Sequence, residues 1–254
     1  MKFSEWLDFK DQVVVITGGR RGIGRALACA FASAGAKIAV AGKSADAGEL
    51  TGIFAANDWS LFYFQADLAK REERLKFIPE VIRRYGTLDV LINNAGTQNP
   101  ASVEDYTPEQ WDSELALLLT APFELSQQAG RIMCKKRSGK IINIASISSF
   151  QGARNIIGYS TAKHGIVGLT KCLANEFAPH QVNVNAIAPG LVKTDLAAAV
   201  FSDPQRAEIL RSRIPDGRFA DPEDIVGPAM FLAGKMSSHV HGHVLLVDGG
   251  WMGR

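Results

Sequence analysis

Cysteine, net charge and long hydrophobic segments are all scarce in this sequence. Its three cysteines, Cys29, Cys134 and Cys172, lie far apart and form no CxxC pair, which favours a reducing compartment over a disulfide framework or a zinc site. Basic residues number 28 and acidic residues 26, so the net charge of +2 gives no broad attraction to nucleic acid or to an anionic membrane. We therefore expect neither of these partners.

Targeting and membrane-spanning patterns are missing as well. No uncharged apolar run approaches the length needed to cross a membrane. Residues 1–12 carry acidic side chains and lack the apolar stretch of a secretory signal. The protein is therefore expected to be cytoplasmic.

The chain shows no internal repeat, low-complexity tract or Gly/Ser/Pro linker, so we expect one domain over residues 1–254. With 46% hydrophobic residues, this length can bury a large core. Short apolar runs rich in β-branched residues alternate with longer helical patterns. Strands are expected at 12–18, 37–42, 60–67, 88–96, 139–146, 182–190 and 243–250, and helices at 24–34, 70–85, 107–130, 157–178 and 221–234.

This alternation predicts an α/β fold with a doubly wound parallel sheet of seven strands and helices on both faces. Residues 191–219 interrupt the alternation with a short, irregular and partly charged stretch. We interpret this stretch as a helical flap for the substrate, beside the strand ends where such sheets bind ligands.

Residues 17–24, TGGRRGIG, follow the first apolar run and open the first helical pattern. Gly18 lets the chain turn out of the strand, and Gly22 and Gly24 let the backbone approach a pyrophosphate that faces the N–H groups of the helix. This position at the start of an alternating chain favours a dinucleotide site over an ordinary glycine turn. The expected cofactor contacts here are Gly18, Arg20, Arg21, Gly22, Ile23 and Gly24.

Tyr159 and Lys163, in YSTAK, are four residues apart at the start of an apolar helix and so share one face. Ser146 ends a strand shortly before, so the three side chains can meet. A phenol is a poor base at neutral pH, but we expect the Lys163 ammonium and a nicotinamide ring to lower the pKa of Tyr159. Tyr159 would then act as general acid or base on the substrate oxygen, which Ser146 would hold, while Lys163 would also reach the cofactor ribose.

The spacing TGxxxGIG, with NNAG at 93–96, YSTAK at 159–163 and PGLVKT at 189–194, resembles the short-chain dehydrogenase/reductase family over essentially the whole chain. The resemblance implies a Rossmann fold, a nicotinamide cofactor, and interconversion of a carbonyl and a secondary alcohol by Ser146, Tyr159 and Lys163. It also implies a homotetramer built on the helices that follow the fourth and fifth strands. Further cofactor contacts implied by it are Asn94, Ala95 and Gly96 at the adenosine ribose, Asp67 and Leu68 at the adenine, and Pro189, Gly190, Val192 and Thr194 at the nicotinamide.

One position departs from the family pattern. Leu118 stands where members usually carry an asparagine that holds a water in a proton relay from the lysine. We expect activity to survive, with that water held by backbone carbonyls. A large gain in turnover in Leu118→Asn would contradict this expectation.

The end of the second predicted strand bears on the choice of cofactor. NAD-preferring members of this fold carry an acid there, which binds the ribose hydroxyls. Here Gly42, Lys43 and Ser44 occupy this place. Lys43 and Arg21 are expected to clamp a 2′-phosphate, with Arg20 nearer the other phosphates, so NADP(H) should be preferred over NAD(H). Solvated surface cations remain the alternative interpretation of these side chains.

The loop before Tyr159 should line the substrate pocket, where Gln151 could donate to a polyol and Arg154 could clamp a carboxylate, although either could face solvent. Within the family, the chain most resembles 2-deoxy-D-gluconate 3-dehydrogenases and related enzymes of keto-deoxy sugar acids, including 4-deoxy-5-keto uronates. The stretches that carry this resemblance are SFQG, NVNAIAPG, RSRIPDGRF and VDGGW. A 3-oxoacyl-acyl-carrier-protein reductase is the main alternative, because Arg206, RSR at 211–213 and Arg218 could form a basic patch. A non-catalytic nucleotide sensor is a further alternative.

Three histidines at positions 239, 241 and 243 alternate before the last strand. No acid or cysteine completes a ligand set with them, so we interpret them as edge or interface residues and expect no metal site.

Overall fold

The computed structural model describes residues 6–253, apart from the side chain of residue 199. Its seven strands pair in parallel in the order β3-β2-β1-β4-β5-β6-β7. This arrangement confirms the predicted fold class. The strands are β1 (Val13–Thr17), β2 (Lys37–Gly42), β3 (Leu61–Gln65), β4 (Val90–Asn93), β5 (Gly139–Ile144), β6 (Val182–Pro189) and β7 (Val244–Val247).

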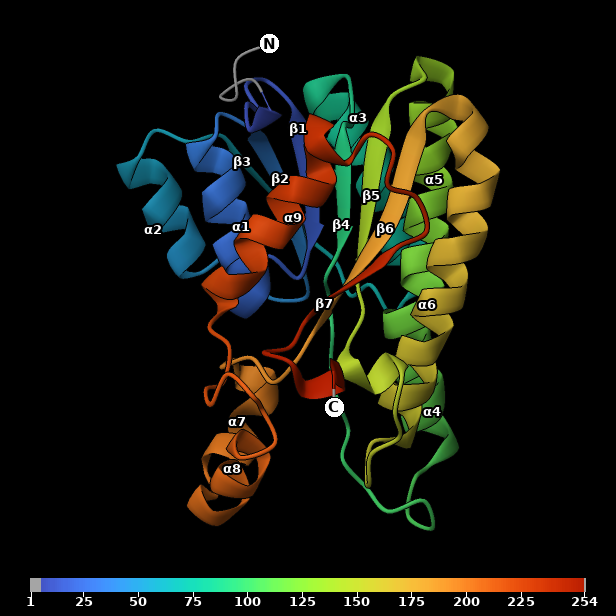
Figure 1. Ribbon diagram of the computed structural model, residues 1–254. Coiled ribbons are helices and arrows are strands. Elements are labelled where there is room, and N and C mark those ends of the chain that lie inside the picture. Colours follow the sequence, from blue (N-terminus) through green and yellow to red (C-terminus); the bar gives the residue numbers. More distant parts are fainter. Residues whose placement is uncertain (1–5, 254) are drawn as a thin grey trace.

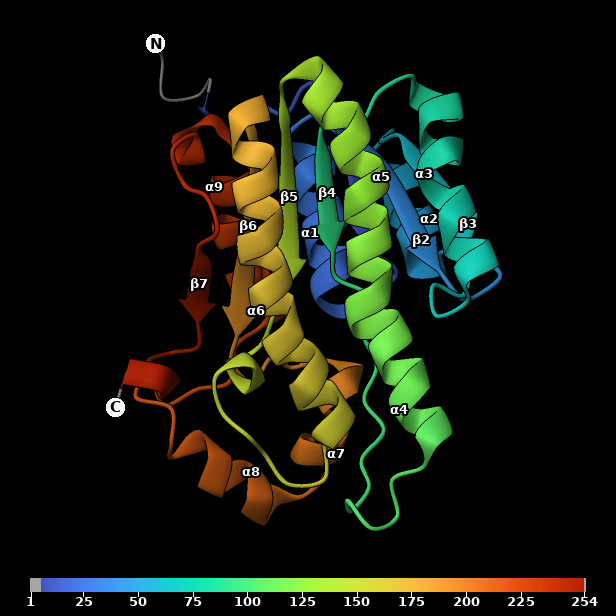
Figure 2. The same ribbon diagram turned by 90° about the vertical axis from the view of Figure 1, so that its right-hand side faces the viewer.

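Nine α-helices lie within residues 6–253, and most of them cover the two faces of the sheet. Helices α1, α2 and α9 pack on one face, and α3, α5 and α6 pack on the other (Figures 1 and 2). The helices are α1 (Gly22–Ser33), α2 (Glu49–Ala56), α3 (Arg71–Tyr85), α4 (Pro108–Leu115), α5 (Ala121–Lys136), α6 (Ile157–Phe177), α7 (Ala198–Phe201), α8 (Pro204–Arg211) and α9 (Val226–Ala233).

The two covered faces explain the continuous apolar runs of the central strands. Along β1, Val14 and Ile16 belong to the core under α1, whereas Val13 and Val15 belong to the core under α3 and α5. Successive side chains of a strand point to opposite faces, so a strand buried on both sides carries no polar alternation.

Buried polar side chains connect two central strands to the helices behind them. Asn93 at the end of β4 donates to Asn143 Oδ1 of β5 at 2.8 Å and to Ser126 Oγ of α5 at 3.0 Å. Asn143 in turn donates to Thr170 Oγ1 of α6 at 2.9 Å. Because buried amides need specific partners, this chain fixes how β4 and β5 sit against α5 and α6 near the carboxyl edge of the sheet.

Two elements differ from the sequence-based expectation. Helix α2 was not predicted, because Gly48 and Gly52 weaken its helical pattern, and burial of Leu50 and Phe54 stabilises it. The helix predicted over 107–130 is α4 and α5 joined by a π-helical turn over Ala116–Thr120, and it continues to residue 136.

The segment 191–219 lies below the carboxyl edge of the sheet, where α7 and α8 stand apart from the main layers (Figure 1). It has a small hydrophobic cluster of its own, in which Ile214 and Phe219 pack with Trp251 and with Ile147, the residue after Ser146. This segment therefore lies next to the end of β5.

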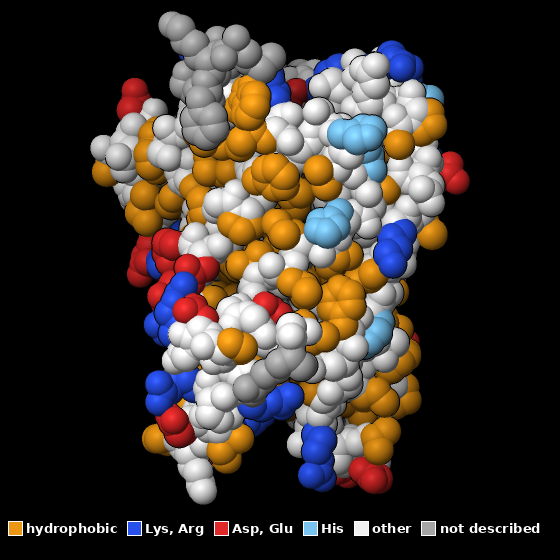
Figure 3. Space-filling model, viewed as in Figure 1, with side chains coloured by type: hydrophobic (Ala, Val, Ile, Leu, Met, Phe, Trp, Pro, Cys, Tyr) orange, Lys and Arg blue, Asp and Glu red, His pale blue; other side chains and the backbone are white. Residues whose placement is uncertain are grey.

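One face of the molecule carries a band of hydrophobic side chains over α9 and β7 (Figure 3). Strand β7 is the edge of the sheet, and the side chain of Leu246 is 42% exposed there. Within residues 6–253, no helix combines the length and hydrophobicity required to cross a membrane.

Candidate active site

The TGGRRGIG turn leaves the carboxyl end of β1 and leads into α1. Gly18 has a φ of +66°, and a Cβ on it would lie 2.8 Å from Cα of Ala95, so glycine is required. A Cβ on Gly24 would overlap the carbonyl oxygen of Gly18 and lie 2.6 Å from Asn94 Nδ2. The Asn94 amide donates to the carbonyls of Thr17 at 2.9 Å and Gly18 at 3.1 Å, which joins the end of β4 to the turn.

The start of α1 suits an anionic ligand. Its N-cap residue Arg21 makes no side-chain capping hydrogen bond in the described part of the chain, and its first turn carries no acid. The free N–H groups and the helix dipole then favour a phosphate over the turn. Ile23 packs against the core and holds this end of the helix in place. These residues fit a dinucleotide cofactor.

Ser146, Tyr159 and Lys163 come together from the end of β5 and the first turns of α6. Ser146 caps a short 3-10 helix with its hydroxyl, which accepts from the N–H of Ser148 at 3.0 Å, and it hydrogen bonds with Tyr159. Lys163 Nζ lies 5.6 Å from the centre of the Tyr159 ring and donates to the carbonyl of Ile144 at 2.5 Å. The sequence spacing thus produces one compact cluster at the carboxyl edge of the sheet.

Burial dominates the proton affinities of this cluster. Desolvation raises the pKa of Tyr159, the hydrogen bond with Ser146 lowers it, and the charge of Glu114 raises it. Desolvation also lowers the pKa of Lys163 to about 8. In this structure the penalty for burying a phenolate is the largest effect on Tyr159, and the lowering of its pKa by Lys163 together with a nicotinamide ring stays a prediction for the cofactor complex.

The basic side chains near the turn do not pair as expected. Arg20 Nη1 donates to Ser44 Oγ at 2.7 Å, at the end of β2. Arg21 Nη1 instead pairs with Asp195 at 2.8 Å, and Lys43 pairs with Asp67 at 3.0 Å. Both cations of the expected clamp thus pair with acids of the protein itself. The clamp of a 2′-phosphate by Arg21 and Lys43 stays a prediction, and Arg20 beside Ser44 is a further candidate for it. Arg21 has an extended backbone, with φ −149° and ψ 171°, so neighbouring side chains point in opposite directions.

The remaining predicted cofactor residues lie on loops at the same edge of the sheet. Leu68 is 4% exposed beside Asp67, whose Oδ1 accepts from the N–H of Ala69 at 3.1 Å. A Cβ on Gly22 would lie 3.0 Å from Cγ2 of Thr194, so the segment after β6 contacts the glycine turn. Ala95 and Gly96 follow β4, and Pro189, Gly190 and Val192 end or follow β6.

The two predicted substrate residues have different surroundings. Gln151 is half-buried directly after the short helix capped by Ser146. Arg154 lines a cavity of about 600 Å³ together with Ser160, Thr161 and His164 of α6. Ser146, Tyr159 and Lys163 do not line that cavity, and the binding of a substrate carboxylate by Arg154 stays a prediction.

A buried acid that the sequence pattern does not predict lies beside the cluster of Ser146, Tyr159 and Lys163. Glu114 of α4 has no exposed surface and accepts a hydrogen bond of 2.6 Å from the hydroxyl of Tyr106. Leu118 lies one turn further, 1% exposed in the π-helical turn, and its Cδ2 faces Gly96. The sequence does offer one signal for this burial, because Glu114 directly precedes the apolar run LALLL.

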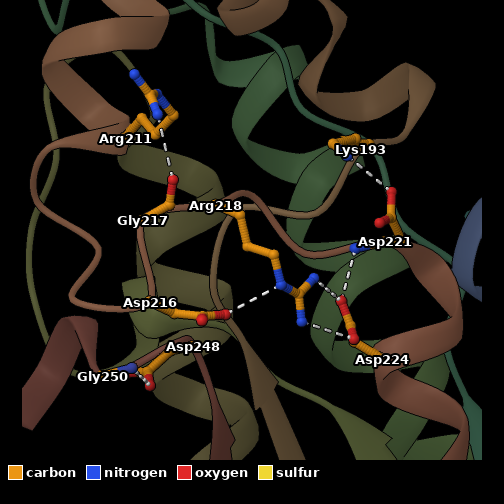
Figure 4. A network of polar contacts seen from close by, with 9 residues as sticks. All are labelled: Lys193, Arg211, Asp216, Gly217, Arg218, Asp221, Asp224, Asp248 and Gly250. Atoms are coloured by element: carbon orange, nitrogen blue, oxygen red, sulfur yellow. Dashed lines mark hydrogen bonds and ion pairs between the residues drawn. The ribbon is translucent and has the colours of Figure 1, made fainter.

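Ion pairs hold the base of the 191–219 segment (Figure 4). Arg218 forms two hydrogen bonds with Asp224, at 2.6 and 3.0 Å, and a further ion pair with Asp216 at 3.1 Å. Lys193 pairs with Asp221 at 3.0 Å. These contacts fasten the chain after β6 to the chain that leads into α9.

Gly24→Ala is expected to lower the free energy of unfolding by about 1–3 kcal/mol, because a Cβ would overlap the Gly18 carbonyl. Thermal unfolding with and without NADPH would measure this loss and the accompanying loss of cofactor binding. Gly52→Ala is the matched control, since a Cβ there meets nothing within 4 Å in the middle of α2. Equal stability of the two variants would contradict the close contact at Gly24.

The chain is similar to known proteins in sequence and in fold. The family model of the short chain dehydrogenases matches residues 12–205. A 2-dehydro-3-deoxy-D-gluconate 5-dehydrogenase from Pseudoalteromonas atlantica is 39% identical over 252 residues, which cover 98% of this chain and 99% of that protein.

Two solved structures are similar over nearly their whole length. A candidate NAD(P)-dependent gluconate 5-dehydrogenase from Beutenbergia cavernae, with NADP bound at low occupancy, gives a TM-score of 0.94 at 42% identity and covers 98% of this chain and 100% of its own. A gluconate 5-dehydrogenase from Burkholderia cenocepacia, in complex with NADP and tartrate, gives 0.94 at 31% identity and covers both chains fully. This chain therefore belongs to the short chain dehydrogenase family and is a dehydrogenase that acts on CH–OH groups.

Proposed function

We propose that the protein interconverts a carbonyl and a secondary alcohol on a keto-deoxy sugar acid or uronate, with NADP(H) preferred over NAD(H). The observation that carries this proposal is the cluster of Ser146, Tyr159 and Lys163 beside the glycine turn of β1. The sugar-acid dehydrogenase named among its relatives supports the substrate class.

The cluster accounts for the proton steps of the reaction. A bound nicotinamide cofactor would supply the hydride for reduction and accept it in oxidation. The Ser146 hydroxyl would hold the substrate oxygen, and the phenol of Tyr159 would donate its proton to that oxygen during reduction and recover it during oxidation. Lys163, kept close to the Tyr159 ring by its bond to the Ile144 carbonyl, would stabilise the phenolate that remains.

Arg20 supports the preference for NADP(H). Its guanidinium lies beside Ser44, where a dinucleotide on this fold carries its adenosine ribose. A 2′-phosphate there would accept charge-assisted hydrogen bonds from Arg20 and Ser44. Lys43 would be available to the same phosphate if it released Asp67, and NADP is bound in the Burkholderia relative.

Arg213 supports an acidic substrate. Its guanidinium lies 4.2 Å from the centre of the Trp251 ring and, within residues 6–253, forms no ion pair with an acid. Trp251 packs in the same cluster as Ile147, which follows Ser146. We propose that the substrate carboxylate binds Arg213, under a flap formed by residues 191–219.

The charges near the flap weigh against the acyl-carrier alternative. Recognition of an acidic carrier protein would need free basic side chains. Arg211, however, pairs with Glu208 at 2.5 Å, and Arg218 pairs with Asp216 and Asp224 (Figure 4). These ion pairs neutralise two of the four arginines of the predicted patch, which weakens it as a surface for an acidic carrier, so the sugar-acid assignment is preferred.

We also propose that the protein is a cytoplasmic homotetramer. The exposed apolar side chains of Leu246 on β7 and Phe123 on α5, 42% and 43% exposed, would be covered by further copies of the chain. Sedimentation would give the number of subunits.

A substrate comparison tests the proposed function. With NADPH, we expect a kcat/KM for 2-dehydro-3-deoxygluconate or a 4-deoxy-5-keto uronate at least ~100-fold above that for an acetoacetyl thioester, because only the sugar acids supply the hydroxyls and carboxylate. An analogue with the carboxylate reduced to an alcohol serves as the matched control and should react far more slowly. Faster reduction of the thioester would favour the acyl-carrier alternative.

A further inference from the structure

Glu114 is a completely buried acid that the catalytic scheme above does not use. It lies in the last turn of α4, and both of its carboxylate oxygens accept hydrogen bonds: Oε1 from the N–H of Asn99 at 2.5 Å, and Oε2 from the hydroxyl of Tyr106 at 2.6 Å. Within residues 6–253, no lysine, arginine or histidine forms an ion pair with it. Both of its oxygens are therefore satisfied by neutral donors in a region shielded from water.

The carboxylate lies against the first turn of the helix that carries the catalytic tyrosine. A Cβ on Gly158 would be 2.5 Å from Glu114 Oε2 and would overlap the hydroxyl of Tyr106. Gly158 immediately precedes Tyr159, so α6 can approach α4 this closely only because a glycine stands there. The peptide that carries Tyr159 is thus packed directly on the charged group.

Few other charges act on Tyr159. Lys163, on the same helix, lies beside the Tyr159 ring. Glu114 of α4 acts on the Tyr159 hydroxyl through space, and Ser146 at the end of β5 contributes a neutral hydroxyl. His164, also on α6, places its Nδ1 at the carbonyl of Ser160 and faces the separate cavity. The negative charge that opposes ionisation of Tyr159 therefore comes from Glu114 among the described residues.

We propose that Glu114 is a positioning residue of the catalytic centre, which anchors the first turn of α6 through Tyr106 and the close contact at Gly158, and which adds to burial in opposing ionisation of the Tyr159 phenol. A phenol in this form can give a proton to a carbonyl oxygen, whereas oxidation of an alcohol requires the phenolate. Glu114 consequently favours carbonyl reduction near neutral pH. The statement about direction rests on the proposed function, but the effect on the proton of Tyr159 does not.

Glu114→Gln tests this role, because it removes the charge and keeps the shape of the side chain. Loss of the charge lowers the pKa of Tyr159, so Tyr159 should ionise at lower pH in the variant. Oxidation of the sugar alcohol by NADP⁺ at neutral pH should become about three- to tenfold faster, and reduction should fall off at lower pH than in the wild type. Asp112→Asn, an exposed acid on the same helix, removes the same charge and should leave both profiles unchanged.

The proton of Tyr159 can be followed without any substrate. The chain contains four tyrosines, so ¹³Cζ-tyrosine NMR titration of the full protein resolves them, and Tyr159→Phe assigns the signal of interest. Tyr106→Phe removes the hydrogen bond to Glu114 but keeps the carboxyl group, so Tyr159 should ionise at the same pH as in the wild type. This variant also tests the proposal if Glu114→Gln folds poorly.

Two results would overturn the proposal. One is an unchanged titration of Tyr159 in Glu114→Gln. The other is an equal downward shift in Tyr106→Phe, which would make packing rather than charge the cause. If the titration shifts as expected but no sugar acid is turned over, the proposed function fails while the role of Glu114 stands.

Discussion

Tyr159→Phe is expected to reduce the rate of hydride transfer about 10³-fold and to leave NADPH binding nearly unchanged. The substitution removes only the hydroxyl that exchanges a proton with the substrate oxygen, and general acid catalysis of this kind contributes about 10²–10⁴-fold. In the wild type, Lys163 Nζ lies 5.6 Å from the centre of the Tyr159 ring. The phenyl ring of the variant should keep this place, so the packing of the cluster should be retained.

Single-turnover oxidation of bound NADPH, followed by its absorbance, measures this loss directly. Tyr85→Phe is a matched control, because it removes a hydroxyl that contacts Ser60 at 3.1 Å and the Ile38 carbonyl at 3.4 Å near the amino ends of β2 and β3, at the other end of the strands. That control should keep full activity. A Tyr159→Phe enzyme within about tenfold of the wild type would rule out Tyr159 as the general acid.

Arg20→Ala is expected to raise the KM for NADPH by about 10–100-fold and to change the KM for NADH little. A hydrogen bond between charged groups contributes about 1.5–3 kcal/mol, and each 1.4 kcal/mol is a factor of ten in affinity. NADH lacks the 2′-phosphate and therefore gains nothing from this guanidinium. Steady-state kinetics with both cofactors give the change in KM for NADPH and the change in KM for NADH.

Arg21→Ala is the natural control for this experiment, since it removes the same charge from the adjacent residue. Its guanidinium pairs with Asp195 at 2.8 Å on the opposite side of the turn, so its loss should affect NADPH and NADH alike. A selective loss of NADPH binding in Arg21→Ala, with none in Arg20→Ala, would restore the assignment made from the sequence. Equal efficiency of the wild type with NADH would contradict the preference itself.

Much of the fold was predictable because its signals are local. The apolar run of β1, the glycine turn and the alternation of strands with helices all follow from the preferences of neighbouring residues. The four-residue spacing of Tyr159 and Lys163 is also a local signal, because helix geometry alone places the two side chains on one face. Helix α2 escaped prediction because its stability depends on burying Leu50 and Phe54 against distant strands.

The residues predicted to bind cofactor and substrate show where local information ends. Arg20 and Arg21 are adjacent and chemically identical, and only the backbone direction at the turn decides which of them reaches Ser44. Arg154 follows the catalytic strand closely in sequence, yet it lines a cavity on another side of α6. The direction of a side chain in a loop depends on contacts that spacing does not encode.

The sequence by itself determined the family, the sheet, the glycine turn and the grouping of Ser146, Tyr159 and Lys163, because each depends on residues close together in the chain or on a regular repeat. Only the tertiary structure decided the electrostatics of the site. Glu114 lies 45 positions before Tyr159 in the chain, and its effect arises because α4 packs on α6 at Gly158. Burial strengthens the interaction of charges that water would otherwise screen, and burial is a property of the whole fold.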